Sequence, residues 1–102
     1  MAPRAFEHKF EWDPVKAGKN FKKHGVAFDR AASVFSDPSA LSRLDEGHSD
    51  NEERWATLGL DRNGIIVVVC HTYAESQPGG SSIRIISARK ATKKEARSYK
   101  GA

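Results

Sequence analysis

Several features that are common in proteins are missing or scarce in this chain, beginning with cysteine. The single cysteine, Cys70, cannot form an intramolecular disulfide, and its place after a run of valines favours a buried position. The longest apolar run, residues 65–70, is far too short to cross a bilayer. Residues 1–13 lack the apolar stretch of a signal peptide. We therefore expect a cytoplasmic protein with no membrane association.

The usual motifs for nucleotides, metals and nucleophilic catalysis are also missing. There is no GxGxxG, GKS or GKT motif and no nucleophile elbow, although composition alone leaves a Ser-His-Asp triad open. The histidines and the cysteine do not lie at close ligand spacing. We therefore expect no cofactor and no metal site.

The chain does have an excess of basic residues, and they are unevenly placed. Its 102 residues suit a single domain over 1–102, with a formal charge of +4 and a pI of about 9.4. Bases concentrate in residues 9–23 and 84–100, and acids in residues 45–53. If the fold joins the chain ends, the basic segments form one face for an anionic partner. Ordinary surface charge is the alternative interpretation.

Periodicity predicts an α+β domain with helices packed on an antiparallel sheet. The expected order is an N-terminal strand, two helices, a four-stranded antiparallel meander and a C-terminal helix. Residues 75–82 are expected to form a loop. The elements expected are a strand within 10–13, helices at 14–24 and 28–35, strands at 39–44, 54–60, 65–73 and 82–88, and a helix after residue 92.

Local signals mark several of the element ends. Asp13-Pro14 is typical of a helix start and Gly25 of a helix end, and Ala17-to-Phe21 spacing suits a core-facing stripe. Asn63-Gly64 indicates a hairpin before the apolar strand, which we expect to be central. Thr92 followed by Glu95 predicts a capping box for the last helix.

The strongest functional signal lies in IRIISARKATKKEARSY, residues 83–99. Arg84 lies inside the last strand and Arg89 at its exit. Strict alternation puts them on opposite faces, so a bulge or the strand end near Ala88 is needed to bring them together. A phosphate-binding surface and a structural ion pair between Arg84 and Glu53 are alternatives of equal weight.

Other candidate residues have structural alternatives too. Lys23 and His24 end the first helix, where the helix dipole favours a cation, but His24 can also exchange protons near neutral pH. Glu53 can act as a base or hold Arg54 or Arg84 in place. In the last helix, Tyr99 can stack on a nucleobase or pack the helix onto the sheet.

The chain resembles the BrnT family, the toxin half of a type II toxin–antitoxin pair. The resemblance rests on residues 10–38, 48–59 and 83–99, which cover more than half of the chain in the family's order. It implies a RelE-like α+β fold and a ribonuclease activity that blocks translation. It also implies a neutralising BrnA-like antitoxin, whose dimer would bind operator DNA and hold two toxins.

The resemblance also assigns residues. The family's Lys-His-Gly corresponds to residues 23–25 and its Ser-Ala-Arg to residues 87–89. Its terminal helix motif corresponds to Glu95 and Arg97. Ala96 stands where many members have a second arginine, which reduces the positive charge of that helix.

The resulting hypothesis is a metal-independent endoribonuclease. An RNA 2′-hydroxyl would attack the adjacent phosphorus and expel the 5′-oxygen, which requires a base, an acid and positive charge. Arg84 and Arg89 would donate to the phosphate oxygens, His24 would be the acid or base, and Glu53 the reserve base. The residues expected to bind the RNA are Lys23, Arg54, Lys93, Lys94, Arg97 and Tyr99.

Two other interpretations fit the same sequence. One is a non-catalytic basic module that grips nucleic acid or an acidic partner. The other is a toxin that has lost catalysis and keeps only antitoxin binding. A binder should lose affinity gradually as basic residues are removed, whereas an enzyme should lose turnover abruptly.

Overall fold

The computed structural model describes residues 7–48, 53–77 and 80–101, and its elements follow the predicted order with one addition. None of the helices in these ranges is long and apolar enough to span a membrane. The elements are β1 (Glu7–Glu11), α1 (Pro14–His24), α2 (Phe28–Ser33), the 3₁₀ turn η1 (Val34–Ser36), β2 (Leu41–Leu44), the 3₁₀ turn η2 (Glu46–His48), β3 (Arg54–Leu60), β4 (Ile66–Thr72), β5 (Ala74–Gln77), β6 (Gly80–Lys90) and α3 (Lys93–Gly101).

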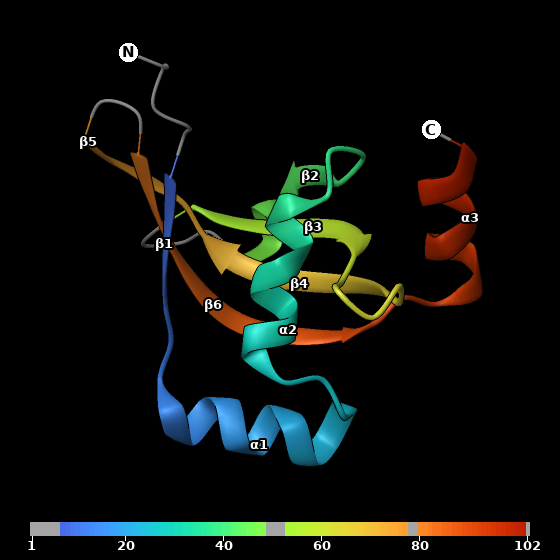
Figure 1. The fold of residues 1–102 in the computed structure, drawn as a ribbon, viewed down its shortest axis with the longest axis horizontal. Coiled ribbons are helices and arrows are strands. Elements are labelled where there is room, and N and C mark those ends of the chain that lie inside the picture. Colours follow the sequence, from blue (N-terminus) through green and yellow to red (C-terminus); the bar gives the residue numbers. More distant parts are fainter. Residues whose placement is uncertain (1–6, 49–52, 78–79, 102) are drawn as a thin grey trace.

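The strands form one sheet in the order β1-β6-β4-β3-β2 (Figure 1). The predicted antiparallel meander is confirmed as β2, β3, β4 and β6, and β4 is central. Two features go beyond the prediction, since β1 pairs with β6 in parallel and β5 pairs with the beginning of β6. The prediction of a loop over residues 75–82 is therefore wrong for residues 75–77 and 80–82, which belong to the paired strands β5 and β6.

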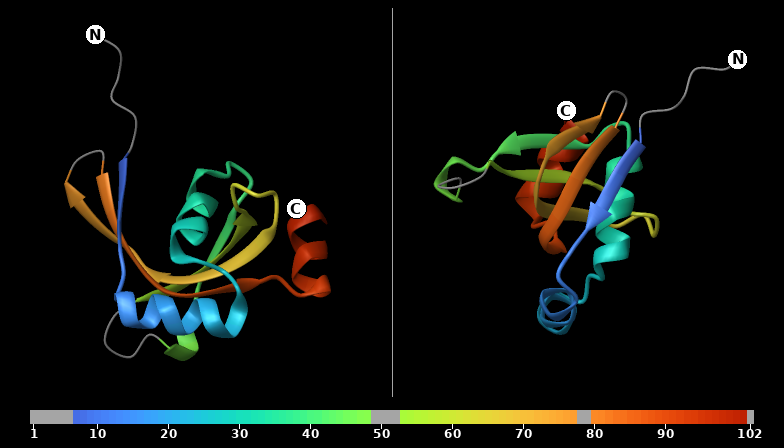
Figure 2. Two further views of the ribbon diagram at one scale, coloured as in Figure 1. Left: turned by 60° about the horizontal axis from the view of Figure 1, so that its bottom comes forward. Right: turned by 90° about the vertical axis from the view of Figure 1, so that its left-hand side faces the viewer.

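The core lies between the sheet and α2 with the turn η1, on what we call the helix-covered face, while α1 runs along the β6 edge (Figures 1 and 2). Apolar residues from α2 and η1 pack there against alternate residues of the strands. Gly59 of β3 is required at this contact, because a Cβ atom would lie 2.9 Å from Val34 Cγ1. The buried core residues are Val26, Phe28, Ala31, Val34, Val67, Val69, Ile83, Ile85 and Ala88.

Helix α1 has the predicted ends but a different buried face. The Asp13 side chain caps its start, and Gly25 ends it with a φ of 72°. Phe21, expected in the core, has 56% of its surface exposed. Asn20 is buried instead, because its amide hydrogen-bonds the backbone N–H and C=O of Ala88 at 3.1 and 2.9 Å. The helix thus covers part of the β6 edge through a polar side chain.

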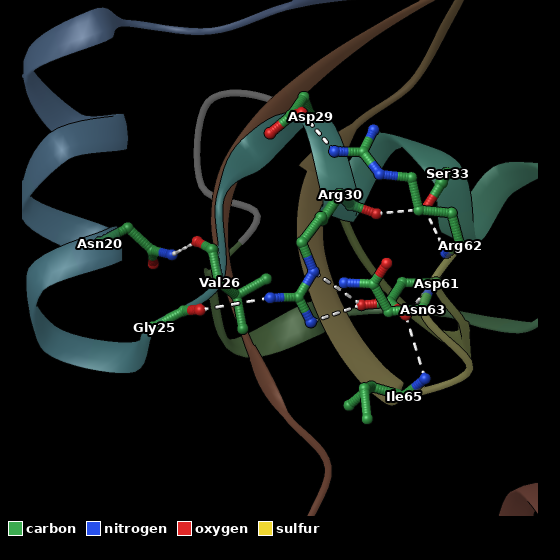
Figure 3. Close-up of polar contacts among 10 residues, drawn as sticks. All are labelled: Asn20, Gly25, Val26, Asp29, Arg30, Ser33, Asp61, Arg62, Asn63 and Ile65. Carbon is green, nitrogen blue, oxygen red and sulfur yellow. Dashed lines mark hydrogen bonds and ion pairs between the residues drawn. The ribbon is translucent and has the colours of Figure 1, made fainter.

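The β3–β4 hairpin contains the predicted Asn63-Gly64 turn and is tied to α2 (Figure 3). The buried Asp61 carboxylate accepts from Arg30 Nη2 at 2.7 Å and from Arg30 Nε at 3.1 Å. It also accepts from the backbone N–H groups of Asn63 and Ile65. A buried charge with four such donors is fully compensated, so this cluster is structural.

Candidate RNA-binding face

A β-bulge in β6 decides which way its arginines point. Cys70 of β4 pairs with Ser87, but the next residue, His71, pairs with Ile85, so Ile86 is the extra residue. From Ser81 to Ile85 the buried side chains are at odd-numbered positions, whereas after the bulge the buried position is the even-numbered Ala88. A bulge, one of the two features that could bring Arg84 and Arg89 together, is therefore present. Arg84 and Arg89 project to the same face of the sheet, opposite the helix-covered face.

The register of the meander adds two further arginines to this face. Arg43 of β2 pairs with Ala56, which pairs with Cys70, and directly paired residues share a face. Arg54 begins β3 two residues before Ala56, so it also projects to this face. We call the surface formed by Arg43, Arg54, Arg84 and Arg89 the arginine face. Strands β2, β3, β4 and β6 contain no aspartate or glutamate, while Glu11 of the neighbouring strand β1 pairs with Arg84 and shares this face. Four arginines outnumber this strand carboxylate, so the face favours anions.

One end of the arginine face is hollowed where the sheet meets α3. The hollow has a volume of about 210 Å³. Its floor is apolar and its rim is polar, which suits an extended chain better than an enclosed small molecule. The lining residues are Leu41, Ser42, Arg43, Ala56, Leu58, Val68, Glu95 and Ser98.

Arg89 is held beside this hollow by an ion pair with Glu95 of α3, which lines it. Its two terminal nitrogens donate to the Glu95 carboxylate at 2.7 and 2.9 Å. Glu95 also accepts from the backbone N–H of Thr92, whose hydroxyl accepts from Glu95 N–H, so the predicted capping box is confirmed. The Arg89 hydrogen bonds, with the capping bond, lower the pKa of Glu95 to about 2. Glu95 is therefore an anion at neutral pH and has no proton to give.

The cationic residues predicted in the last helix lie along α3, beyond the end of β6 (Figure 2). Lys93, Lys94 and Arg97 are exposed there. The Tyr99 hydroxyl donates to Asp37 Oδ2 at 2.6 Å, which attaches the helix to the loop after η1. This contact supports the packing interpretation of Tyr99, and a contact with RNA stays a prediction.

Among the residues that the structure describes, no hydrogen bond or ion pair joins the predicted acid–base residues His24 and Glu53 to Arg43 or Arg89. His24 is the last residue of α1 and is half-buried, with Lys23 exposed beside it. Glu53 is exposed and immediately precedes Arg54 at the start of β3. Another histidine, His71, lies on the helix-covered face, where burial lowers the pKa of its imidazole. The roles of His24 and Glu53 stay predictions.

Sequence reasoning missed Arg43. The loose alternation in residues 39–44 contains the signal, but only the pairing of Arg43 with Ala56 shows which face it takes. Guanidinium groups donate in a planar fork that matches phosphate oxygens. The arginine face can therefore hold a phosphodiester backbone and stabilise extra negative charge on one of its phosphates.

Comparisons with known proteins show the fold and the family of the chain. The fold and the site define a small α+β protein with helices on one sheet face and a cationic surface on the other. The crystal structure of the Brucella abortus ribonuclease toxin, BrnT, has this fold, with a TM-score of 0.59 and 24% identity over 84% of this chain and 99% of that one. No curated protein sequence matches. The family model for BrnT, the ribonuclease toxin of type II toxin–antitoxin systems, matches residues 12–95, and the chain belongs to this family.

Proposed function

We propose that this protein is a metal-independent endoribonuclease that inhibits translation and is neutralised by a cognate antitoxin. The observation that carries the proposal is the arginine face, with four guanidinium groups on strands that contain no acidic residue. The family supplies the class of activity, a ribonuclease toxin. The partners proposed are single-stranded RNA, a BrnA-like antitoxin, and operator DNA reached only through that antitoxin, all in the cytoplasm.

In the proposed reaction the RNA 2′-oxygen bonds to the neighbouring phosphorus and the bond to the 5′-oxygen breaks. The 2′-hydroxyl loses its proton and the departing 5′-oxygen gains one, so atoms and charge balance. The phosphorus passes through a five-coordinate state with an additional negative charge. Arg43, which lines the hollow, and Arg89, which pairs with the lining residue Glu95, supply donors to the oxygens of that state. Arg84 and Arg54 hold the backbone alongside.

Proton transfer remains with His24 as acid or base and Glu53 as reserve base. Glu95 takes no part as a proton donor, because its low pKa keeps it ionised. Its carboxylate instead orients Arg89. With no acid–base pair among the strand residues of this face, charge stabilisation carries most of the expected rate enhancement.

A non-catalytic basic module is the second candidate, and the same arginine face favours it. The two functions differ in how they respond to single substitutions. An enzyme loses turnover abruptly when one transition-state donor is removed, whereas a binder loses affinity in small, similar steps.

The test is RNA cleavage by purified protein in the presence of a chelator, with translation followed in a cell extract. Arg43→Ala is the sharpest variant, because Arg43 is exposed and forms no ion pair with another residue that the structure describes. Arg62→Ala is a matched control, since Arg62 is an exposed arginine that pairs with Asp29 of α2, away from the arginine face. We expect Arg43→Ala to lower turnover about 100-fold and Arg62→Ala to leave it unchanged. Intact RNA with folded wild-type protein would favour the binding module.

A further inference from the structure

The helix-covered face contains a second concave site, which we call the aromatic pocket. It has a volume of about 310 Å³, near the lower end of the 300–1,000 Å³ range that is typical of ligand pockets. Rings from four different parts of the fold line it: His8 of β1, Phe35 of η1, Trp55 of β3 and Tyr73 after β4. Tyr73 has 40% of its surface exposed, so the pocket is accessible at that side.

The polar atoms of the pocket have a fixed hydrogen-bond direction. His71 Nδ1 lies 3.0 Å from the Thr72 carbonyl oxygen, which can only accept, so Nδ1 carries the proton. Burial lowers the pKa of His71, which leaves the imidazole neutral and Nε2 an acceptor. The Thr57 hydroxyl, 2.6 Å from Nε2, must therefore donate to it.

This direction fixes the role of Ser42, which also lines the pocket. The Thr57 hydroxyl has given its only proton to His71, so the Ser42 hydroxyl, 2.7 Å away, must donate to Thr57. The Ser42 oxygen then has only lone pairs to offer a ligand. The site thus combines aromatic walls with an acceptor that is held in place by two buried residues, Thr57 and His71.

We propose that the aromatic pocket binds one unpaired base of the RNA substrate, which stacks on the rings and donates an N–H to Ser42. Single-stranded RNA is read in this way, by stacking on aromatic side chains and by hydrogen bonds to base edges. The pocket volume suits one base, and the net positive charge of the chain suits the attached phosphates. Because Arg54 and Trp55 project to opposite faces, the bound base belongs to a nucleotide other than the one that is cleaved.

The inference rests on the proposed function but is tested without cleavage. Neutral nucleosides carry no phosphate and do not respond to the arginines, so their binding reports the pocket alone. The chain has two tryptophans, and Trp12 packs against Phe28 with ring centroids 6.0 Å apart. In a Trp12→Phe variant the fluorescence comes only from Trp55. If that variant does not fold, the indole N–H signals of the wild-type protein, observed by NMR, give the same readout.

Adenosine, guanosine, cytidine and uridine are titrated separately. We expect at least one of them to change the Trp55 signal saturably, with a dissociation constant of about 1 mM. Tyr73→Ala should weaken this binding about 10-fold by removing a stacking wall, and Ser42→Ala about 3- to 10-fold by removing the acceptor. Phe21→Ala is the matched control, because it removes an exposed aromatic ring from α1, outside the pocket.

The outcomes separate the two proposals. The base pocket is overturned if no nucleoside changes the Trp55 signal. It is also overturned if neither Tyr73→Ala nor Ser42→Ala weakens the binding, even if the protein cleaves RNA. The pocket is established if a nucleoside binds saturably, if Tyr73→Ala and Ser42→Ala weaken that binding, and if Phe21→Ala leaves it unchanged. If RNA then stays intact, the pocket belongs to a non-catalytic RNA-binding protein and only the proposed ribonuclease activity fails.

Discussion

At the scale of single residues, the two ion pairs between α2 and the β3–β4 hairpin differ in burial. The Asp61 side chain is 0% exposed and its partner Arg30 18%, whereas Asp29 and Arg62 are 57% and 55% exposed. Breaking a buried pair leaves a charge without solvent or partner, while an exposed pair is already solvated. The two pairs should therefore contribute very differently to stability.

Asp61→Asn should lower the free energy of unfolding by about 3 kcal/mol, because Arg30 loses its carboxylate in a largely buried position. Asp29→Asn, the matched control, should cost about 0.5 kcal/mol or less. Urea denaturation followed by circular dichroism measures both. Equal losses in the two variants would show that burial does not decide the effect.

Glu95 gives the ion pair at the rim of the hollow a defined pH dependence. Its pKa in the folded protein is about 2, against an ordinary value of 4.5. A carboxylate with a lowered pKa contributes stability above its unfolded pKa, and loses that contribution as the pH falls toward the folded value. The contribution should thus be complete above about pH 5 and be lost between about pH 4.5 and 2.

Glu95→Gln tests this dependence. The variant should be less stable than wild type by about 1–2 kcal/mol at pH 7, a figure that allows for the partial exposure of the pair. The difference should shrink as the pH is lowered toward 2 in urea titrations. A difference that stays constant from pH 7 to 3 would mean that Glu95 stabilises α3 without its charge.

At the scale of elements, α3 is attached to the rest of the protein near both ends. Its first turn is held by the capping box and the Arg89–Glu95 pair, and its last turn by the Tyr99–Asp37 hydrogen bond. None of the α3 residues described is fully buried, so these polar contacts replace the apolar face that most helices pack on the core. The position of its lysines beside the arginine face depends on them.

Removing the Tyr99 hydroxyl should therefore loosen the last turn of α3. Tyr99→Phe is expected to speed amide hydrogen exchange in that turn, while Ser98→Ala, which loses only a bond to the helix's own Lys94 carbonyl, should not.

The Asp37 hydrogen bond also raises the pKa of Tyr99. Absorbance titration of a Tyr73→Phe variant, which leaves Tyr99 as the only tyrosine, should show ionisation above pH 10 that Asp37→Asn moves down. An unchanged titration would contradict the contact.

At the scale of the whole molecule, local chemistry and the antiparallel meander could be predicted from the sequence, whereas the parallel pairing of β1 and the face taken by single residues could not. Asp13, Gly25 and the Thr92 capping box are read from a few neighbouring residues, and the structure confirms them. By contrast, the parallel pairing of β1 with β6 and the sheet face taken by Arg43 depend on strands that lie elsewhere in the chain. The bulge at Ile86 is a further case, because a single extra residue reverses the alternation that follows it.

The same limit applies to the candidate site. The sequence singled out Arg84 and Arg89, but whether they act together depended on the bulge. The place of Arg43 on the arginine face and the aromatic pocket on the opposite face both depend on strand register, which brings together residues that are distant in the sequence. Phe21 shows that a local pattern can also mislead. Its helical spacing from Ala17 suggested burial, but the hydrogen bonds between Asn20 and β6 orient α1 so that Asn20 is buried and Phe21 is exposed.

The charge of the whole chain leads to a final prediction about the antitoxin. An antitoxin that covers the arginine face with acidic residues should associate quickly at low salt, because opposite charges steer the encounter. The screening length falls from about 10 Å at 0.1 M salt to about 3 Å at 1 M, so association should slow by at least about 10-fold over that range. Arg43→Ala should weaken this salt dependence, and Arg62→Ala, on the hairpin beside α2, should not. Stopped-flow association of the purified pair measures the effect, and a rate that does not respond to salt would place the antitoxin on another, uncharged surface.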